Sequence, residues 1–266
     1  MAACRRQQQT EMSNQTDNKE VSKYREIFPG TFTMLNAVCG FIAILQTLDG
    51  EVINACWFIM LAGFLDVLDG KVARLSGVSS RFGIELDSLA DFLSFGVAPA
   101  VLINSLQLAS LGKMGWIIIT TVYVVAAGFR LAKFNLYADT EEKKGFVGLP
   151  VPGAALAMIS FIILSYKLWG SMQYGEWLVS MIILFAFLMV SQVEYDTFPE
   201  TFQSKQGRIK LLFMIAAAGA VLIWPRLMLF PILALYILYG MIRELYRLFA
   251  KGVVKVTRKA GENETS

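Results

Sequence analysis

The sequence predicts an all-α membrane protein, a polytopic transmembrane helical bundle, and three observations support this. Hydrophobic residues make up 56% of the 266 residues, and mean hydropathy is +0.54. Charged residues are only 17% of the chain, against about 25% in ordinary soluble domains. Apolar runs of roughly 20 residues, the length that crosses a bilayer, recur along nearly the whole chain. Runs this long and continuous favour helices over a closed β-barrel.

The apolar runs predict eight spans. They lie near residues 32–48, 52–72, 84–108, 114–132, 150–168, 177–193, 209–224 and 227–245. Six spans, also an even number, would likewise place both termini on the same side of the membrane, but would leave two apolar runs unplaced. The first 28 residues are polar and contain no apolar segment of the signal-peptide kind, so we expect no cleaved signal there.

The distribution of basic residues predicts the orientation. With the N-terminus in the cytoplasm, 21 of the 24 lysines and arginines fall on cytoplasmic segments, and only Lys113, Lys167 and Arg226 fall outside. Both termini and the active site are therefore expected on the cytoplasmic side. If the source is a prokaryote, the protein is expected in the cell membrane. The net charge of +3 is too small to suggest nucleic acid as a partner. Cys4, Cys39 and Cys56 imply no disulfide or zinc framework.

Four aspartates stand where the second and third predicted spans approach their short connecting loop. At about 100° per residue, Asp66 and Asp69 share one face of the second helix, and Asp87 and Asp91 repeat at i and i+4 on the third. A carboxylate at bilayer depth costs roughly 2.5 to 3.5 kcal/mol on insertion scales, so four together need a positive partner. Because the short loop makes the two helices antiparallel neighbours, we expect a cup of four carboxylates.

The donor set predicts a hard divalent cation. Carboxylates suit Mg²⁺ or Mn²⁺, and the chain has no histidine. Two ions would balance four charges, and paired ions roughly 3.5 to 4 Å apart suit an in-line phosphoryl displacement. Small residues beside the acids, Gly70, Ala73 and Gly83, would let a nucleotide diphosphate approach the backbones, and Arg74 could contact phosphate. The alternative is close helix packing with acids paired to nearby basic residues, which gains nothing from four carboxylates in register.

A sequence pattern spans the two acidic helices. It reads DxxDGxxAR from Asp66, then eight residues, then GxxxDxxxD ending at Asp91. This pattern resembles the signature of the CDP-alcohol phosphatidyltransferase family at every fixed position. The resemblance covers about residues 28–193 and implies a six-helix core. It implies metal ligation by all four aspartates, with Asp91 also the general base; spacing alone does not identify the base. The implied CDP site contains Gly70, Ala73, Arg74 and Gly83, and we expect Thr33 and Asn36, at the same membrane face, to join it.

A second pattern bears on the acceptor alcohol. RLAKFN at 130–135, followed by GLPVP at 148–152, resembles the phosphatidylserine synthases within this family and implies L-serine as acceptor. Guanidinium binds carboxylate through two parallel bonds, so Arg130, with Lys133 and Asn135, is expected to line the serine pocket. The alternative for Arg130 is a snorkelling anchor. GLPVP is independently a turn that starts a helix. Glu194 departs from the pattern, since a basic residue is expected near it.

The resemblance thus implies an enzyme that moves the phosphatidyl group of CDP-diacylglycerol onto L-serine, with membrane lipids around it and a homodimer as the expected assembly. One rival keeps the reaction but uses glycerol 3-phosphate, inositol phosphate or choline; Lys133, Lys143 and Lys144 could bind a phosphorylated acceptor. A rival of another class is a cation transporter, but transporter sites usually lie at the midplane on broken helices.

The expected domain organisation has four parts. Residues 1–28 form a polar cytoplasmic tail, and 29–194 form the six-helix catalytic membrane domain. Two additional helices occupy 195–250, and a basic, polar cytoplasmic tail occupies 251–266.

Overall fold

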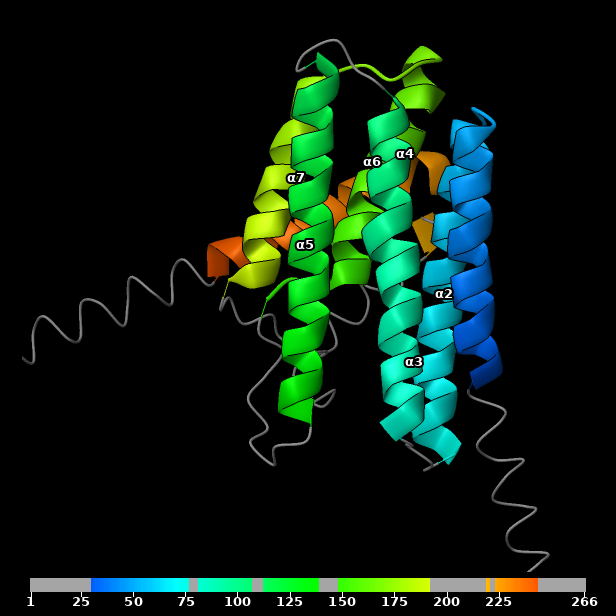
Figure 1. The fold of residues 1–266 in the computed structure, drawn as a ribbon. Coiled ribbons are helices and arrows are strands. Elements are labelled where there is room, and N and C mark those ends of the chain that lie inside the picture. Colours follow the sequence, from blue (N-terminus) through cyan, green and yellow to red (C-terminus); the bar gives the residue numbers. More distant parts are fainter. Residues whose placement is uncertain are drawn as a thin grey trace, which may run out of the picture. The chain divides into compact units, whose positions relative to one another are not determined.

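In the computed structural model, every regular element within the described residues is a helix (Figure 1). The structure describes residues 30–76, 81–106, 112–138, 148–191, 219–220 and 223–243. The all-α prediction is confirmed for this part of the chain. Two units are distinguished, Met1–Ser105 and Leu106–Ser266.

Six helices within the described ranges are long and apolar enough to cross a membrane: Gly30–Leu48, Val52–Val72, Arg81–Ser105, Gly112–Leu136, Val151–Trp169 and Pro225–Arg243. A seventh apolar helix, Gly175–Val190, is shorter, at 16 residues. The chain is therefore an integral membrane protein. The predicted span at 209–224 lies largely outside the described residues.

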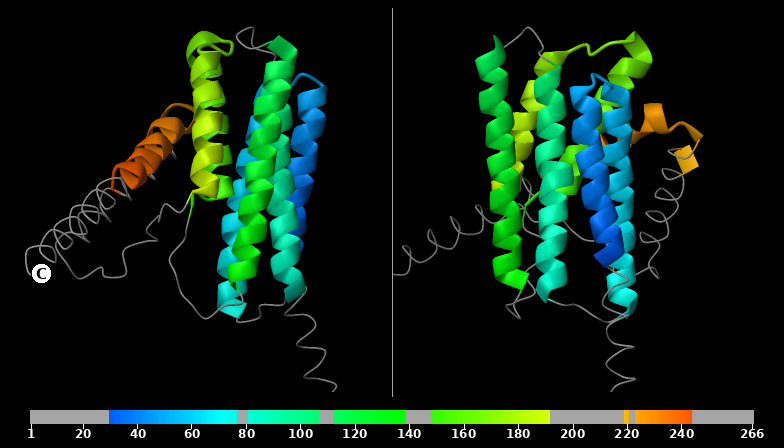
Figure 2. Two further views of the ribbon diagram at one scale, coloured as in Figure 1. Left: turned by 60° about the vertical axis from the view of Figure 1, so that its left-hand side comes forward. Right: turned by 45° about the vertical axis from the view of Figure 1, so that its right-hand side comes forward.

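The first unit begins with the helix Gly30–Leu48, which runs beside α2, Val52–Ser76 (Figures 1 and 2). A tight turn joins them. Gly50 has a φ of +80°, the Glu51 N–H donates to the Gln46 carbonyl at 2.8 Å, and the Gly50 N–H donates to the Thr47 carbonyl at 3.1 Å. This is the pattern of a glycine-capped helix end, and it makes the two helices antiparallel neighbours.

The third span is one helical run with a change of winding. α3, Arg81–Asp91, continues into the π-helical segment η1, Phe92–Val97, and then into α4, Ala98–Ser105. α2 packs against both η1 and α4. The i and i+4 spacing of Asp87 and Asp91 corresponds to regular α-helical winding. The winding instead changes directly after Asp91.

The second unit contains α5, Gly112–Ala138, α6, Val151–Trp169, and α7, Gly175–Val190, followed by the helix Pro225–Arg243. α5 and α7 pack against each other, and α6 contacts both. Pro150 and Pro152 stand at the start of α6, as the GLPVP pattern predicts. Before them, Gly148 adopts a φ of +87°, and the Leu149 N–H donates to the Leu188 carbonyl at 3.2 Å.

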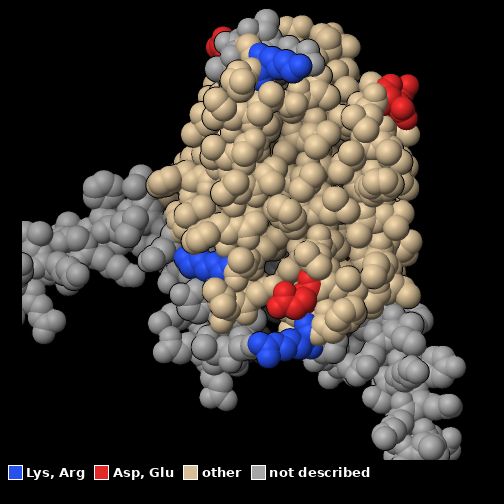
Figure 3. Space-filling view, in the orientation of Figure 1, with Lys and Arg blue, Asp and Glu red and all other residues tan. Residues whose placement is uncertain are grey.

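Large apolar side chains are exposed on these helices. Phe64 and Val67 of α2 are 60% and 54% exposed, and Phe187 of α7 is 70% exposed. Charged side chains are sparse on the face drawn in Figure 3. In water such patches would mark binding or aggregation sites. In a chain with membrane-spanning helices, lipid tails solvate them.

Candidate active site

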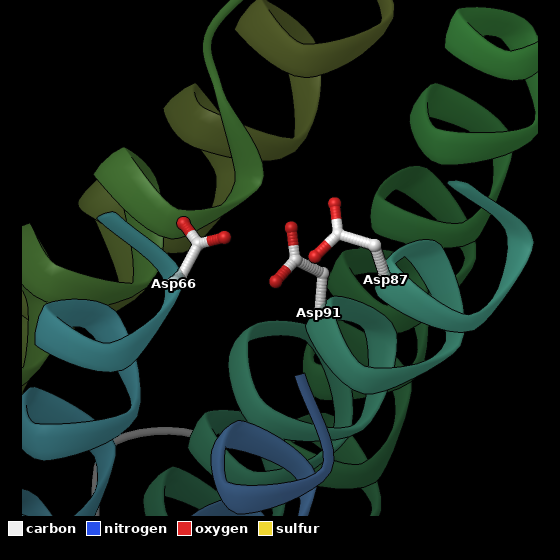
Figure 4. A group of neighbouring side chains, drawn as sticks. All are labelled: Asp66, Asp87 and Asp91. Carbon is white, nitrogen blue, oxygen red and sulfur yellow. The ribbon is translucent and has the colours of Figure 1, made fainter. Parts of the chain in front are cut away.

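Three carboxylates from two helices meet in the first unit. Asp66 of α2 and Asp87 and Asp91 of α3 each offer an oxygen atom, and these oxygens all lie within 4.8 Å of one another. Figure 4 shows Asp66 reaching from α2 towards the two carboxylates of α3. Asp91 is only 8% exposed, and the other two are partly buried. The predicted meeting of the two acidic faces is thus present for three of the four aspartates.

The donor set fits a divalent cation. At an effective dielectric constant of about 20, two ionised carboxylates at this separation repel by about 3 to 4 kcal/mol. A cation between them would convert that repulsion into attraction. The group holds only carboxylate oxygens, which suit magnesium or manganese. The cluster is therefore compatible with a metal site.

Asp69 lies outside this group. It is 6% exposed, and its Oδ2 accepts a short hydrogen bond from the Thr33 hydroxyl of the helix Gly30–Leu48. Its predicted role as a fourth ligand stays a prediction. Thr33 is itself 4% exposed, so this contact is buried.

Asn36, one turn further along the same helix, contacts the cluster directly. Its Nδ2 donates to Asp91 Oδ1 at 3.0 Å, and the residue is fully buried. The other end of the amide, Oδ1, has no hydrogen-bond partner among the described residues. Leaving a buried acceptor unpaired costs about 1 to 3 kcal/mol, so such groups call for an explanation.

The π-helical segment brings a further polar group to Asn36. Ser94 Oγ donates to the Asn36 backbone carbonyl at 2.9 Å. A Cβ on Gly40 would overlap Ser94 Oγ and lie 2.8 Å from Ser94 Cα, so only glycine permits this approach. The Gly40–Ser94 contact was not among the sequence predictions. The only feature of the sequence that points to this contact is a glycine in an apolar run. Such a glycine predicts close helix packing but does not identify the residue it packs against.

Four of the six predicted nucleotide-binding residues lie on α2 and α3, the helices that carry the aspartates, and the other two, Thr33 and Asn36, lie on the helix Gly30–Leu48. Gly70 is exposed, and a Cβ there would meet nothing within 4 Å, so the backbone of α2 is open at this point. Gly83 is partly exposed on α3. The side chains of Ala73 and Arg74 lie outside the described set. The CDP-binding role of all six residues stays a prediction.

The predicted acceptor residues belong to α5 in the second unit. Arg130 is 8% exposed, and its guanidinium carbon lies 5.8 Å from the centre of the Phe134 ring, within the range of a cation–π contact. Lys133 and Asn135 are partly buried. Burial of Arg130 argues against the snorkelling alternative, because a snorkelling head group reaches water. The serine-binding role of the three residues stays a prediction.

Comparison with known proteins agrees with the geometry. The model of the CDP-alcohol phosphatidyltransferase family matches residues 26–192. A Helicobacter pylori protein named CDP-diacylglycerol–serine O-phosphatidyltransferase is 33% identical over 224 residues, which are 83% of this chain and 92% of that protein. A Methanocaldococcus jannaschii protein of the same name is 33% identical over 213 residues, 79% and 90% of the two chains.

The name of a third relative refers to a different lipid. The archaetidylserine synthase of Methanothermobacter thermautotrophicus is 35% identical over 182 residues, 67% of this chain and 73% of that protein. The family match spans more than half of the chain and includes both helices that carry the aspartates. This protein belongs to the CDP-alcohol phosphatidyltransferase family.

Proposed function

We propose that this enzyme transfers the phosphatidyl group of CDP-diacylglycerol to the hydroxyl of L-serine, giving phosphatidylserine and CMP. The observation that carries the reaction is the cluster of Asp66, Asp87 and Asp91 in a chain of this family. The acceptor is supported by the names of the relatives, in which serine recurs.

The chain's own groups suit such a displacement. Asp91 accepts the proton of the serine hydroxyl as its oxygen attacks the phosphorus attached to diacylglycerol. The bond from that phosphorus to the bridging oxygen of CMP breaks, and CMP leaves. Asp66, Asp87 and Asp91, with Asp69, would hold one or two Mg²⁺ or Mn²⁺ ions. Such an ion supplies positive charge to the diphosphate.

Substrate binding is assigned to the remaining predicted residues. Gly70, Ala73 and Gly83 leave room for the nucleotide beside the helix backbones, and Arg74 binds phosphate. Arg130, with Lys133 and Asn135, binds the serine carboxylate. Both termini and the aspartate cluster face the cytoplasm, in line with the distribution of basic residues. A homodimer stays a prediction.

The test measures CMP release by the purified full-length protein from CDP-diacylglycerol. L-Serine, glycerol 3-phosphate, inositol phosphate and choline are supplied separately, with Mn²⁺ or with EDTA, and the lipid product is identified by mass spectrometry. We expect phosphatidylserine with serine only, and loss of turnover with EDTA. Turnover restricted to another alcohol would refute serine as the acceptor, and full turnover in EDTA would refute the metal requirement.

A further inference from the structure

Asn36 is held at two points by the helical run that carries Asp91. Its side-chain Nδ2 donates to Asp91 Oδ1 at 3.0 Å, and its backbone carbonyl accepts from Ser94 Oγ at 2.9 Å. Asn36 and Ser94 are fully buried. Because Asp91 and Ser94 both lie in the run Arg81–Ser105, the two bonds fix Asn36 and the Asp91 carboxylate relative to each other.

The winding of this run supports the arrangement. The π-helical segment starts directly after Asp91 and contains Ser94. π turns are rare within α-helices and occur often at functional sites. Gly40, four residues after Asn36, allows the Ser94 backbone to approach the helix Gly30–Leu48 at a distance that a Cβ would prevent. The close approach brings the Ser94 hydroxyl to the Asn36 carbonyl.

The two ends of the Asn36 amide differ. Nδ2 donates to Asp91 Oδ1, whereas the buried Oδ1 has no partner within the described ranges. A reversed amide would bring two oxygens together at the ionised carboxylate. Asp91 therefore selects one amide orientation, and the amide in turn leaves the second carboxylate oxygen of Asp91 for other partners.

We propose that Asn36 is a positioning residue, which orients the Asp91 carboxylate for cation binding and for accepting the hydroxyl proton. The proton-accepting part rests on the proposed function. Thr33 makes a parallel contact one turn earlier, to Asp69. In this view Asn36 acts through Asp91, which differs from the nucleotide contact that its sequence position suggests. Partners of metal-ligating carboxylates typically contribute about 10- to 100-fold to metal affinity or activity.

The first measurement is calorimetric Mn²⁺ titration of the purified full-length protein, which requires no turnover. Asn36→Leu keeps a similar volume and removes the donor, and we expect the Mn²⁺ dissociation constant to rise by about tenfold or more. Ser94→Ala removes only the hydroxyl. We expect it also to raise the Mn²⁺ dissociation constant, but by less than Asn36→Leu does. The matched control is Asn54→Leu, because Asn54 is exposed on α2 and bonds only weakly, at 3.4 Å, to Glu51.

The second measurement is the kinetics of CMP release. We expect Asn36→Leu to lower kcat by about tenfold or more, with the KM for CDP-diacylglycerol changed by less than about threefold. A raised KM with unchanged kcat would mean that Asn36 contacts the nucleotide, and would overturn the proposal. A lower unfolding temperature with unchanged kcat and Mn²⁺ affinity would mean a structural role, and would also overturn it.

Three further outcomes are informative. If Asn36→Leu does not fold, Ser94→Ala decides, and unchanged Mn²⁺ affinity and kcat in that variant would overturn the proposal. If the unmodified protein releases no CMP with serine, the proposed function fails while the Mn²⁺ titrations still decide the role of Asn36. Absence of any Mn²⁺ binding by the unmodified protein would overturn the proposal itself.

Discussion

Single residues in the aspartate cluster have separate environments. Asp91 is the most buried of the three clustered carboxylates and receives a hydrogen bond from Asn36, whereas Asp66 and Asp87 are partly exposed. A base must be held in a defined orientation to accept a proton from a bound alcohol. The burial of Asp91 and its hydrogen bond from Asn36 support the proposal that it is the base.

Replacing Asp91 tests this assignment. Asp91→Asn preserves the size of the side chain but removes its charge and most of its basicity. General-base catalysis typically contributes about 10²- to 10⁴-fold, so we expect kcat for CMP release to fall by at least about 100-fold. The measurement is steady-state CMP release at saturating Mn²⁺.

The control for Asp91→Asn is Asp49→Asn, because Asp49 is exposed in the turn before α2. We expect that variant to turn over at nearly the rate of the unmodified protein. Near-normal turnover in Asp91→Asn would rule out Asp91 as the base.

Among the secondary-structure elements, the helix Gly30–Leu48 organises the first unit. It supplies the donors to Asp69 and Asp91, and it meets η1 where Gly40 faces Ser94. Close approach of two helices requires a small residue at the crossing point. We therefore expect the hydrogen bonds of the site to depend on a packing contact that involves none of the aspartates.

Gly40→Ala tests this dependence. The new Cβ would lie 2.8 Å from Ser94 Cα, a backbone atom that cannot turn away, so the helices must separate. Overpacking of this kind typically costs about 1 to 3 kcal/mol. We expect a lower unfolding temperature in detergent together with lower turnover.

The matched variant for Gly40→Ala is Gly30→Ala on the same helix, where a Cβ meets nothing within 4 Å. It should leave unfolding temperature and turnover nearly unchanged. Equal behaviour of the two variants would show that the Gly40 approach is unimportant.

The second unit has its own glycine-dependent contact, between the segment before α6 and the end of α7. Gly148 and Gly170 both have positive φ, +87° and +71°, so alanine is strained at either position. That strain is roughly 1 to 2 kcal/mol. Only at Gly148 would a Cβ also meet a backbone atom, the Met189 carbonyl oxygen at 2.7 Å.

We therefore expect Gly148→Ala to lower the unfolding temperature clearly more than Gly170→Ala does. Thermal unfolding of the two variants in the same detergent provides the comparison. Equal losses would indicate that backbone conformation alone matters at Gly148.

At the scale of the whole molecule, orientation in the bilayer follows from charge. Positive residues gather on the predicted cytoplasmic segments, so the C-terminus should be cytoplasmic and the α6–α7 connection external. Alkaline phosphatase is active only outside the cytoplasm. Alkaline phosphatase fused after Gln173, in the α6–α7 connection, should be active. The same enzyme fused after Ser266 should be inactive. An active fusion at Ser266 would refute the proposed orientation.

The sequence by itself determined the all-α membrane architecture and the two helices that carry the carboxylates. Both follow from local properties, because hydropathy over about 20 residues selects a span and a period of 3.6 residues sets which aspartates share a face. The helix ends were predicted less accurately from the sequence. The third span was expected at 84–108 and lies at Arg81–Ser105, since hydrogen bonding at the termini, and not hydropathy, ends a helix.

Only the tertiary structure decided how the aspartates are partnered. Asp66, Asp87 and Asp91 gather, while Asp69 bonds to Thr33, and Asn36 bonds to Asp91 across 55 positions of the chain. The π-helical turn after Asp91 was likewise absent from the expected periodicity. These features depend on how each helix is rotated and how closely it approaches its neighbour. Rotation and approach are set by side-chain packing between distant segments, which a local pattern does not encode.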